Sequence, residues 1–147
     1  MEIRNDALPE ELQKQLKAYV YDIIGCMQHV HNDLGPGLPE YIYQEALIKY
    51  IVKRKIANPI KEYQHHPIFD GTPLESYVKM DLVVPNERGN VIIECKSIKA
   101  LTEKERYQTF GYLRASDFPI AILVNFGTWP KAEIEKYYWK NGVVRAF

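Results

Sequence analysis

Apolar residues at spacings of three and four predict a long helix at the start of the chain, from Pro9 to Leu34. The stripe consists of Leu12, Leu16, Tyr19, Ile23, Met27, Val30 and Leu34. Asn5-Asp6 before it suits a helix start, and Gly35-Pro36-Gly37 after it suits a helix end. A second helix is expected from Pro39 to Lys55.

Beyond this point the hydrophobic period changes to two, which indicates strands. Strands are expected at Ile60–Phe69, Leu74–Val84, Val91–Lys96, Pro119–Asn125, Lys131–Trp139 and Val143–Phe147. A third helix, from Thr102 to Ser116, opens with a pattern close to a capping box, Thr102-Glu103-Lys104-Glu105. The order is therefore α-α-β-β-β-α-β-β-β. No repeat or linker interrupts it, so the chain is expected to form a single α/β domain over residues 1–147.

Composition narrows the class of protein. The chain has 147 residues, of which 46% are hydrophobic, and this is enough for one compact core. No apolar run approaches the roughly 20 residues that span a bilayer. The polar, acidic segment Met1–Leu12 lacks the apolar core of a secretory signal. Cys26 and Cys95 form no metal-type cluster, so two reduced thiols in a cytoplasmic protein are expected, with no membrane partner.

Charge is evenly balanced, with 19 Lys plus Arg against 19 Asp plus Glu. No global positive field therefore attracts a polyanion, and nucleic-acid binding would have to rest on a local basic patch or on bound metal. The best local patch surrounds the third helix and consists of Lys99, Lys104, Arg106 and Arg114. A solvated helix face is the alternative interpretation of these four residues.

The segment Val91–Lys96 carries the most informative chemistry. Glu94 and Lys96 are two residues apart on a strand, so they share one face, and charges at the end of an apolar strand are costly unless paired or bound. A hairpin turn at Asn86–Arg88 places Asp81 opposite Glu94. Two carboxylates and an ammonium are thus expected on one face of a hairpin.

Two interpretations of this cluster remain open. In the first, Asp81, Glu94 and the backbone carbonyl of Cys95 hold a hard divalent cation such as Mg²⁺, which keeps several waters, and Lys96 acts on a bound water. In the second, the three side chains form a salt-bridged cluster at the edge of the sheet. The apolar run before Glu94 and the hairpin spacing to Asp81 favour the first.

These motifs resemble the PD-(D/E)xK nuclease superfamily, in which an Asp on one strand is followed by Glu/Asp-x-Lys on the next. The chain is most similar to a bacterial group named for its GxxExxY signature, which here reads Gly37-Leu38-Pro39-Glu40-Tyr41-Ile42-Tyr43. Three further segments fit this group, namely Asp81-Leu82-Val83-Val84, Glu94-Cys95-Lys96 and Val124-Asn125-Phe126-Gly127. The resemblance implies a restriction-endonuclease-like core, a mixed β-sheet flanked by helices.

The resemblance also adds two residues to the expected site. Glu40 corresponds to a carboxylate that points into the metal site of related nucleases, although stabilisation of the helix start would equally explain its position. Gln108 corresponds to a glutamine that touches the site or the substrate backbone, and a solvent-facing glutamine is the alternative.

The resulting hypothesis is a nuclease that hydrolyses phosphodiester bonds in DNA with Mg²⁺ or Mn²⁺. Asp81, Glu94, Glu40 and the Cys95 carbonyl would hold the metal, with Lys96 and Gln108 completing the catalytic set. RNA is an alternative substrate, because a fold does not determine what is cut. The alternative function is a binding or interaction module that kept the fold without turnover. A homodimer is one way for so small a domain to engage a duplex.

Overall fold

A computed structural model describes residues 10–147, with side-chain environments from Lys14 onward. The expected helix-start residues Asn5 and Asp6, together with Pro9 and the Leu12 side chain, lie outside the described residues. Three helices are present, α1 (Glu10–Leu34), α2 (Glu40–Lys53) and α3 (Glu103–Ser116). They match the three predicted helices to within two residues at each end.

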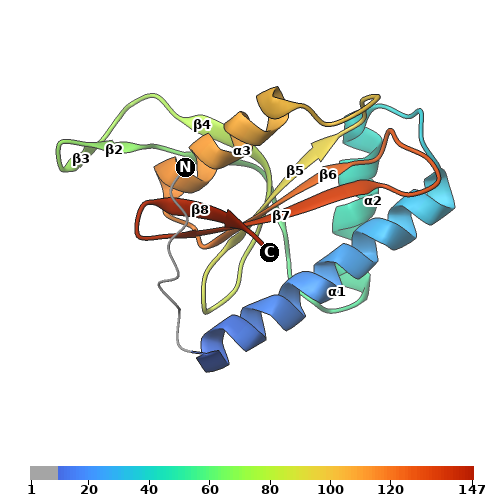
Figure 1. Ribbon diagram of the computed structural model, residues 1–147, viewed down its shortest axis with the longest axis horizontal. Helices are drawn as coiled ribbons and strands as arrows, with labels where there is room; N and C mark the ends of the chain where they lie inside the picture. Colours follow the sequence, from blue (N-terminus) through green and yellow to red (C-terminus); the bar gives the residue numbers. More distant parts are fainter. Residues whose placement is uncertain (1–9) are drawn as a thin grey trace.

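Six strands form the main sheet. They are β1 (Ile60–His65), β4 (Val78–Val84), β5 (Val91–Lys96), β6 (Ile120–Asn125), β7 (Glu133–Lys140) and β8 (Val143–Ala146). Their spatial order is β1-β4-β5-β6-β7-β8, and every neighbouring pair is antiparallel except β5 and β6. Because parallel neighbours need a crossover, α3 connects β5 to β6 across one face of the sheet (Figure 1). The predicted mixed sheet flanked by helices is confirmed.

Each face of the sheet has its own core. One buried cluster joins α1 and α2 to alternate strand residues such as Leu82, Ile93 and Cys95. The other joins α3 to residues on the opposite face, among them Val83 and Ile92. Helices α1 and α2 therefore cover one face and α3 the other, as Figure 1 shows. None of the helices in residues 10–147 is long and apolar enough to cross a membrane.

The connection from β1 to β4 differs from the sequence prediction. The expected strand Ile60–Phe69 breaks at Pro67, because proline lacks the N–H that continues a ladder. A small separate hairpin follows, with β2 (Ile68–Phe69) paired to β3 (Thr72–Pro73). Its turn consists only of Asp70 and Gly71, both with positive φ (54° and 84°), which suits a two-residue hairpin loop. The expected strand from Leu74 begins only at Val78.

Candidate metal and active site

The β4–β5 hairpin places Asp81 opposite Glu94, as the spacing predicts. Backbone partners run from Val84–Val91 to Leu82–Ile93, so Asp81 and Glu94 are the next pair. At this pair, side chains take over from the backbone ladder. The Asp81 backbone N–H donates to Glu94 Oε1 at 3.0 Å, and the Cys95 N–H donates to Asp81 Oδ2 at 2.9 Å. Each carboxylate therefore accepts a hydrogen bond from a backbone N–H, in the place of the backbone carbonyl that would accept it in a regular ladder.

The backbone around Asp81 is distorted on its other side as well. Residues two apart on a strand normally share a face, yet Met80 and Leu82 belong to opposite cores. On the neighbouring strand β1, Glu62 has a left-handed φ of 52° between the pairs Lys61–Leu82 and Tyr63–Met80. A non-glycine residue in this conformation is strained, and such strain gathers at functional positions. The side chains of β4 therefore change from one face of the sheet to the other at Asp81.

Glu94 is almost fully buried, with 1% of its surface exposed. Burial, followed by the negative charge of Asp81, raises the pKa of Glu94 to about 9. The same pair acts on Tyr112 of α3. Burial, then the charges of Glu94 and Asp81, raise the pKa of its phenol to about 12. When no cation is bound, burial and the Asp81 charge therefore both favour the protonated form of Glu94.

Lys96 and Gln108 lie together at the open end of the hairpin. Lys96 Nζ donates a hydrogen bond to Gln108 Oε1 at 3.0 Å. Helix α3 begins in the predicted capping box, since the Thr102 N–H donates to Glu105 Oε2 at 2.9 Å and the Thr102 hydroxyl accepts from the Lys104 N–H at 3.3 Å. The start of α3 thereby brings Gln108 to the β5 lysine, as the sequence comparison implied.

The backbone carbonyl of Cys95 faces the carboxylate side of β5. The Lys96 carbonyl accepts from the Phe126 N–H at 2.8 Å, toward β6. Because backbone groups of successive strand residues point to opposite edges, the N–H and carbonyl of Cys95 both point toward β4. The thiol of Cys95 packs in the α1–α2 core instead, where burial raises its pKa. Cys95 thus offers the site a carbonyl and no sulfur.

Glu40 begins α2 near the same end of β5. The Ser97 hydroxyl donates to the Leu38 carbonyl at 2.6 Å, which ties the start of α2 to the end of β5. The charge of Glu40 also contributes to the raised pKa of the Cys95 thiol, after those of Asp81 and Glu94. Within the described residues, however, no three His, Cys, Asp or Glu side chains converge as a metal site. The structure brings Asp81 and Glu94 together and leaves Glu40 outside that pair, so its metal role stays a prediction.

Comparison with known proteins decides the family. The model of the PD-(D/E)XK nuclease superfamily matches residues 6–137. The chain belongs to the PD-(D/E)XK nuclease superfamily. No curated protein gives a significant match. Among solved structures, the crystal structure of SSO0001 is similar, with a TM-score of 0.43 and 15% identity over 85% of this chain and 74% of that one. The closer resemblance to the GxxExxY group stays a prediction.

Nucleases of the PD-(D/E)XK superfamily generally use divalent metal ions, and the donor set here fits one. Asp81 and Glu94 supply hard oxygen ligands, and the Cys95 carbonyl faces the same side. Burial and the neighbouring Asp81 charge raise the pKa of Glu94, which disfavours ionisation of Glu94 when no positive charge lies between the two carboxylates. A divalent cation between the carboxylates would supply that charge.

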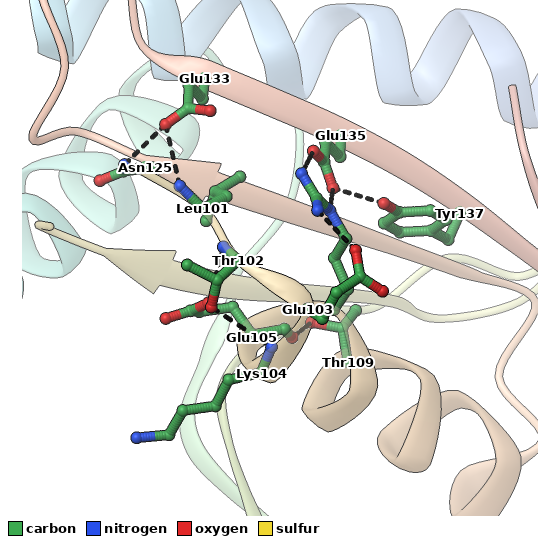
Figure 2. Close-up of polar contacts among 11 residues, drawn as sticks. Leu101, Thr102, Glu103, Lys104, Glu105, Thr109, Asn125, Glu133, Glu135 and Tyr137 are labelled. Atoms are coloured by element: carbon green, nitrogen blue, oxygen red, sulfur yellow. Dashed lines mark hydrogen bonds and ion pairs between the residues drawn. The ribbon is translucent and has the colours of Figure 1, made fainter. Parts of the chain in front are cut away.

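The predicted basic patch is weaker than its composition suggests. Arg106 pairs with Glu103 and with Glu135, each at 2.8 Å, in the network drawn in Figure 2. A guanidinium engaged by two carboxylates is not available to a phosphate. The arginine instead fastens α3 to β7 in this PD-(D/E)XK domain.

Two residues near this nuclease-fold site, Tyr112 and Asn125, were not predicted as site residues, although Asn125 lies in a segment that fits the GxxExxY group. Tyr112 lies one helical turn after Gln108, and that spacing of four is the signal that would have placed it beside the carboxylates. Asn125, at the end of β6, is fully buried and bonds to the segment that follows Lys96. In the sequence, Asn125 stands out as the polar residue that ends an otherwise apolar strand.

Proposed function

We propose that this protein is a divalent-metal-dependent nuclease that hydrolyses phosphodiester bonds in DNA. One observation carries the proposal. The carboxylates of the half-buried Asp81 and the buried Glu94 replace the backbone ladder at the end of the hairpin, and Lys96 with its partner Gln108 follows on β5 and α3. A buried Glu94 whose pKa is raised by burial and by the neighbouring Asp81 charge has no structural advantage over an apolar residue, so a bound cation is the best reason for the presence of this pair.

In this proposal, Asp81, Glu94 and the Cys95 carbonyl hold Mg²⁺ or Mn²⁺, and Glu40 assists through water. The bound metal would neutralise the scissile phosphate and lower the pKa of a water molecule. Lys96 positions that water or stabilises the developing negative charge, and Gln108 orients the Lys96 ammonium.

DNA is the proposed substrate, although the site chemistry acts equally on an RNA phosphodiester in which the metal reaches the phosphate. A homodimer would let two such sites address the two strands of a duplex. A strand-break assay on duplex DNA, single-stranded DNA and RNA of one sequence separates these substrates. Gel filtration with and without DNA tests the dimer.

A second candidate function is a binding module without turnover. The even charge of 19 Lys plus Arg and 19 Asp plus Glu, and the engagement of Arg106 by two carboxylates, favour it. Retention of Asp81, Glu94 and Lys96 in one bonded site opposes it. The two functions differ in a single measurement, namely cleavage that depends on both metal and Lys96.

The decisive assay compares wild type with Lys96→Ala in Mg²⁺, in Mn²⁺ and in EDTA. Cleavage is expected only with metal, and loss of Lys96 should slow it by about 100-fold or more. Lys53→Ala is the matched control, because this lysine is exposed at the C-terminal end of α2 and belongs to neither the site nor the predicted basic patch. Equal, metal-independent signal in wild type and Lys96→Ala would remove the nuclease proposal.

Calorimetric titration of Mn²⁺ tests the ligands separately. Asp81→Asn keeps the size of the side chain and one acceptor for the Cys95 N–H, but it removes the charge. Mn²⁺ affinity should fall by about 10-fold or more. Undiminished binding would reject Asp81 as a ligand while leaving the assay above to judge activity.

A further inference from the structure

The segment between Lys96 and α3 has no regular secondary structure, yet its backbone is bonded along its length. Residues 97–102 lie outside any helix or strand. The Ile98 N–H donates to Asn125 Oδ1 at 3.0 Å, and Asn125 Nδ2 donates to the Ile98 carbonyl at 3.0 Å. One side-chain amide thus satisfies both backbone groups of Ile98, as a neighbouring strand would.

Asn125 uses its whole hydrogen-bonding capacity. Oδ1 also accepts from the Gly127 N–H at 3.0 Å, and Nδ2 also donates to Glu133 Oε1 at 3.0 Å. The same Glu133 oxygen accepts from the Leu101 N–H at 3.1 Å (Figure 2). Two donors face Oδ1 and two acceptors face Nδ2, so only this orientation of the amide satisfies its surroundings. The side chain is 0% exposed, and these bonds have no water to replace them.

Gly127 shows how closely β6 approaches this segment. A Cβ at position 127 would lie 2.3 Å from the Ile98 carbonyl oxygen and 2.6 Å from the Ile98 nitrogen, so only glycine fits. The Phe126 N–H meanwhile donates to the Lys96 carbonyl at 2.8 Å. The end of β6 therefore holds the backbone at Lys96 and again two residues later.

We infer that Asn125, with Glu133 and Gly127, is a positioning residue for the Lys96–Gln108 pair of the proposed nuclease site. Lys96 directly precedes the segment, and α3, which carries Gln108, directly follows it. Loss of the Asn125 amide lets both ends move, so the Lys96 ammonium no longer stays at its 3.0 Å contact with Gln108. The inference rests on the proposed function for its catalytic consequence, and on hydrogen bonds alone for its structural one.

The test uses Asn125→Asp, which keeps the shape and both bonds to Oδ1. It replaces Nδ2 with an oxygen that faces the Ile98 carbonyl and Glu133. We expect kcat to fall by about 10- to 100-fold with KM changed less than threefold, because orientation and not substrate contact is lost. Adding Glu133→Gln restores a donor toward residue 125 at the original net charge, and should recover at least about threefold of kcat.

Val20→Ala, in the core on the far face of the sheet, is the control for general destabilisation. It should lower Tm and leave kcat within about twofold of wild type. If Asn125→Asp behaves like Val20→Ala, with a lower Tm and unchanged kcat, Asn125 is only structural and the inference is overturned.

Amide hydrogen exchange gives a readout that needs no activity. In Asn125→Asp, the amides of Ile98, Leu101 and the first turn of α3 should exchange at least about 10-fold faster, while β4 amides stay unchanged. Unchanged exchange at Ile98 and Leu101 would overturn the inference even if wild type cleaves DNA. If wild type proves inactive, the proposed function fails, and this measurement still decides whether Asn125 holds the segment.

Discussion

The two halves of the β4–β5 hairpin differ in the groups that join strand β4 to strand β5. Near the turn, the pairs Leu82–Ile93, Val83–Ile92 and Val84–Val91 form a regular ladder, and all six side chains are fully buried. At the open end, Asp81 and Glu94 close the ladder with carboxylates, and Lys96 follows. The buried side chains of the apolar half stabilise the fold, whereas the neighbouring carboxylates of the charged half lower its stability. The regular ladder, which is buried on both faces of the sheet, holds the two strands in register. This allows Asp81 and Glu94 to lie one residue beyond it.

Removing both negative charges of the charged half should have the largest effect on metal-dependent cleavage. Asp81→Asn combined with Glu94→Gln removes both charges and keeps oxygen acceptors for the two backbone N–H groups. Metal-dependent cleavage should drop by at least about 1,000-fold. Tm without metal should stay equal or rise, because the repulsion between the carboxylates is gone. A large fall in Tm instead would mean that the pair stabilises the fold.

The pH dependence of stability should separate the halves next. The folded-state pKa of Glu94, about 9, exceeds its ordinary 4.5, so the folded protein retains a proton that the unfolded chain releases between these pH values. Metal-free stability is therefore greatest below this window and falls as the pH rises through it, by on the order of a few kcal/mol.

Thermal unfolding of wild type and Glu94→Gln across pH 5 to 9 measures this effect. The difference between the two Tm values should change with pH by about 5 °C or more, and Mg²⁺ should reduce it at high pH. Parallel curves for the two proteins would contradict the burial of an ionisable Glu94.

A cavity in the apolar half should affect stability alone. Val84→Ala, at the turn end of the ladder, should lower the free energy of unfolding by about 1 to 3 kcal/mol. Urea unfolding measures the loss, and kcat below the transition should stay within about twofold of wild type. A matching loss of kcat would show that the halves are coupled.

The smallest expected effect is at the edge of the charged half. Gln108→Ala removes the acceptor of the Lys96 ammonium and leaves the lysine in place, so kcat should fall by about threefold to 10-fold. Gln28→Ala, which removes an exposed glutamine of α1, is the control. Equal rates for both variants would assign Gln108 to solvent, as the alternative interpretation held.

Local chemistry explains which features the sequence predicted. The apolar runs on both sides of Asn86–Arg88 indicated the register that opposes Asp81 and Glu94, and Thr102-Glu103-Lys104-Glu105 indicated the start of α3. Both depend on residues close in sequence. Asn125 bonds to Ile98 across 27 positions, so its neighbours in the chain mark it only as a polar residue at the end of an apolar strand and do not identify its partner.

The errors have physical causes as well. A period of two continues through Leu74–Tyr77, but these residues project from the sheet with the β2–β3 hairpin and find no partner strand in the described part of the chain. The metal role of Glu40 is not one of these errors and stays a prediction, because a motif does not determine the distance of a side chain from a site on another element. The left-handed Glu62 follows no sequence rule, because glutamate rarely adopts it.

That residue has a consequence beyond the site. Strand β1 forms one outer edge of the sheet, where free backbone groups invite pairing with a strand of another molecule. Glu62 interrupts this edge in the middle of its six residues, and the opposite edge, β8, has only four. Neither edge offers a long, regular template for strand addition. The distortion that turns β4 over at Asp81 therefore also protects the protein from aggregation through its sheet.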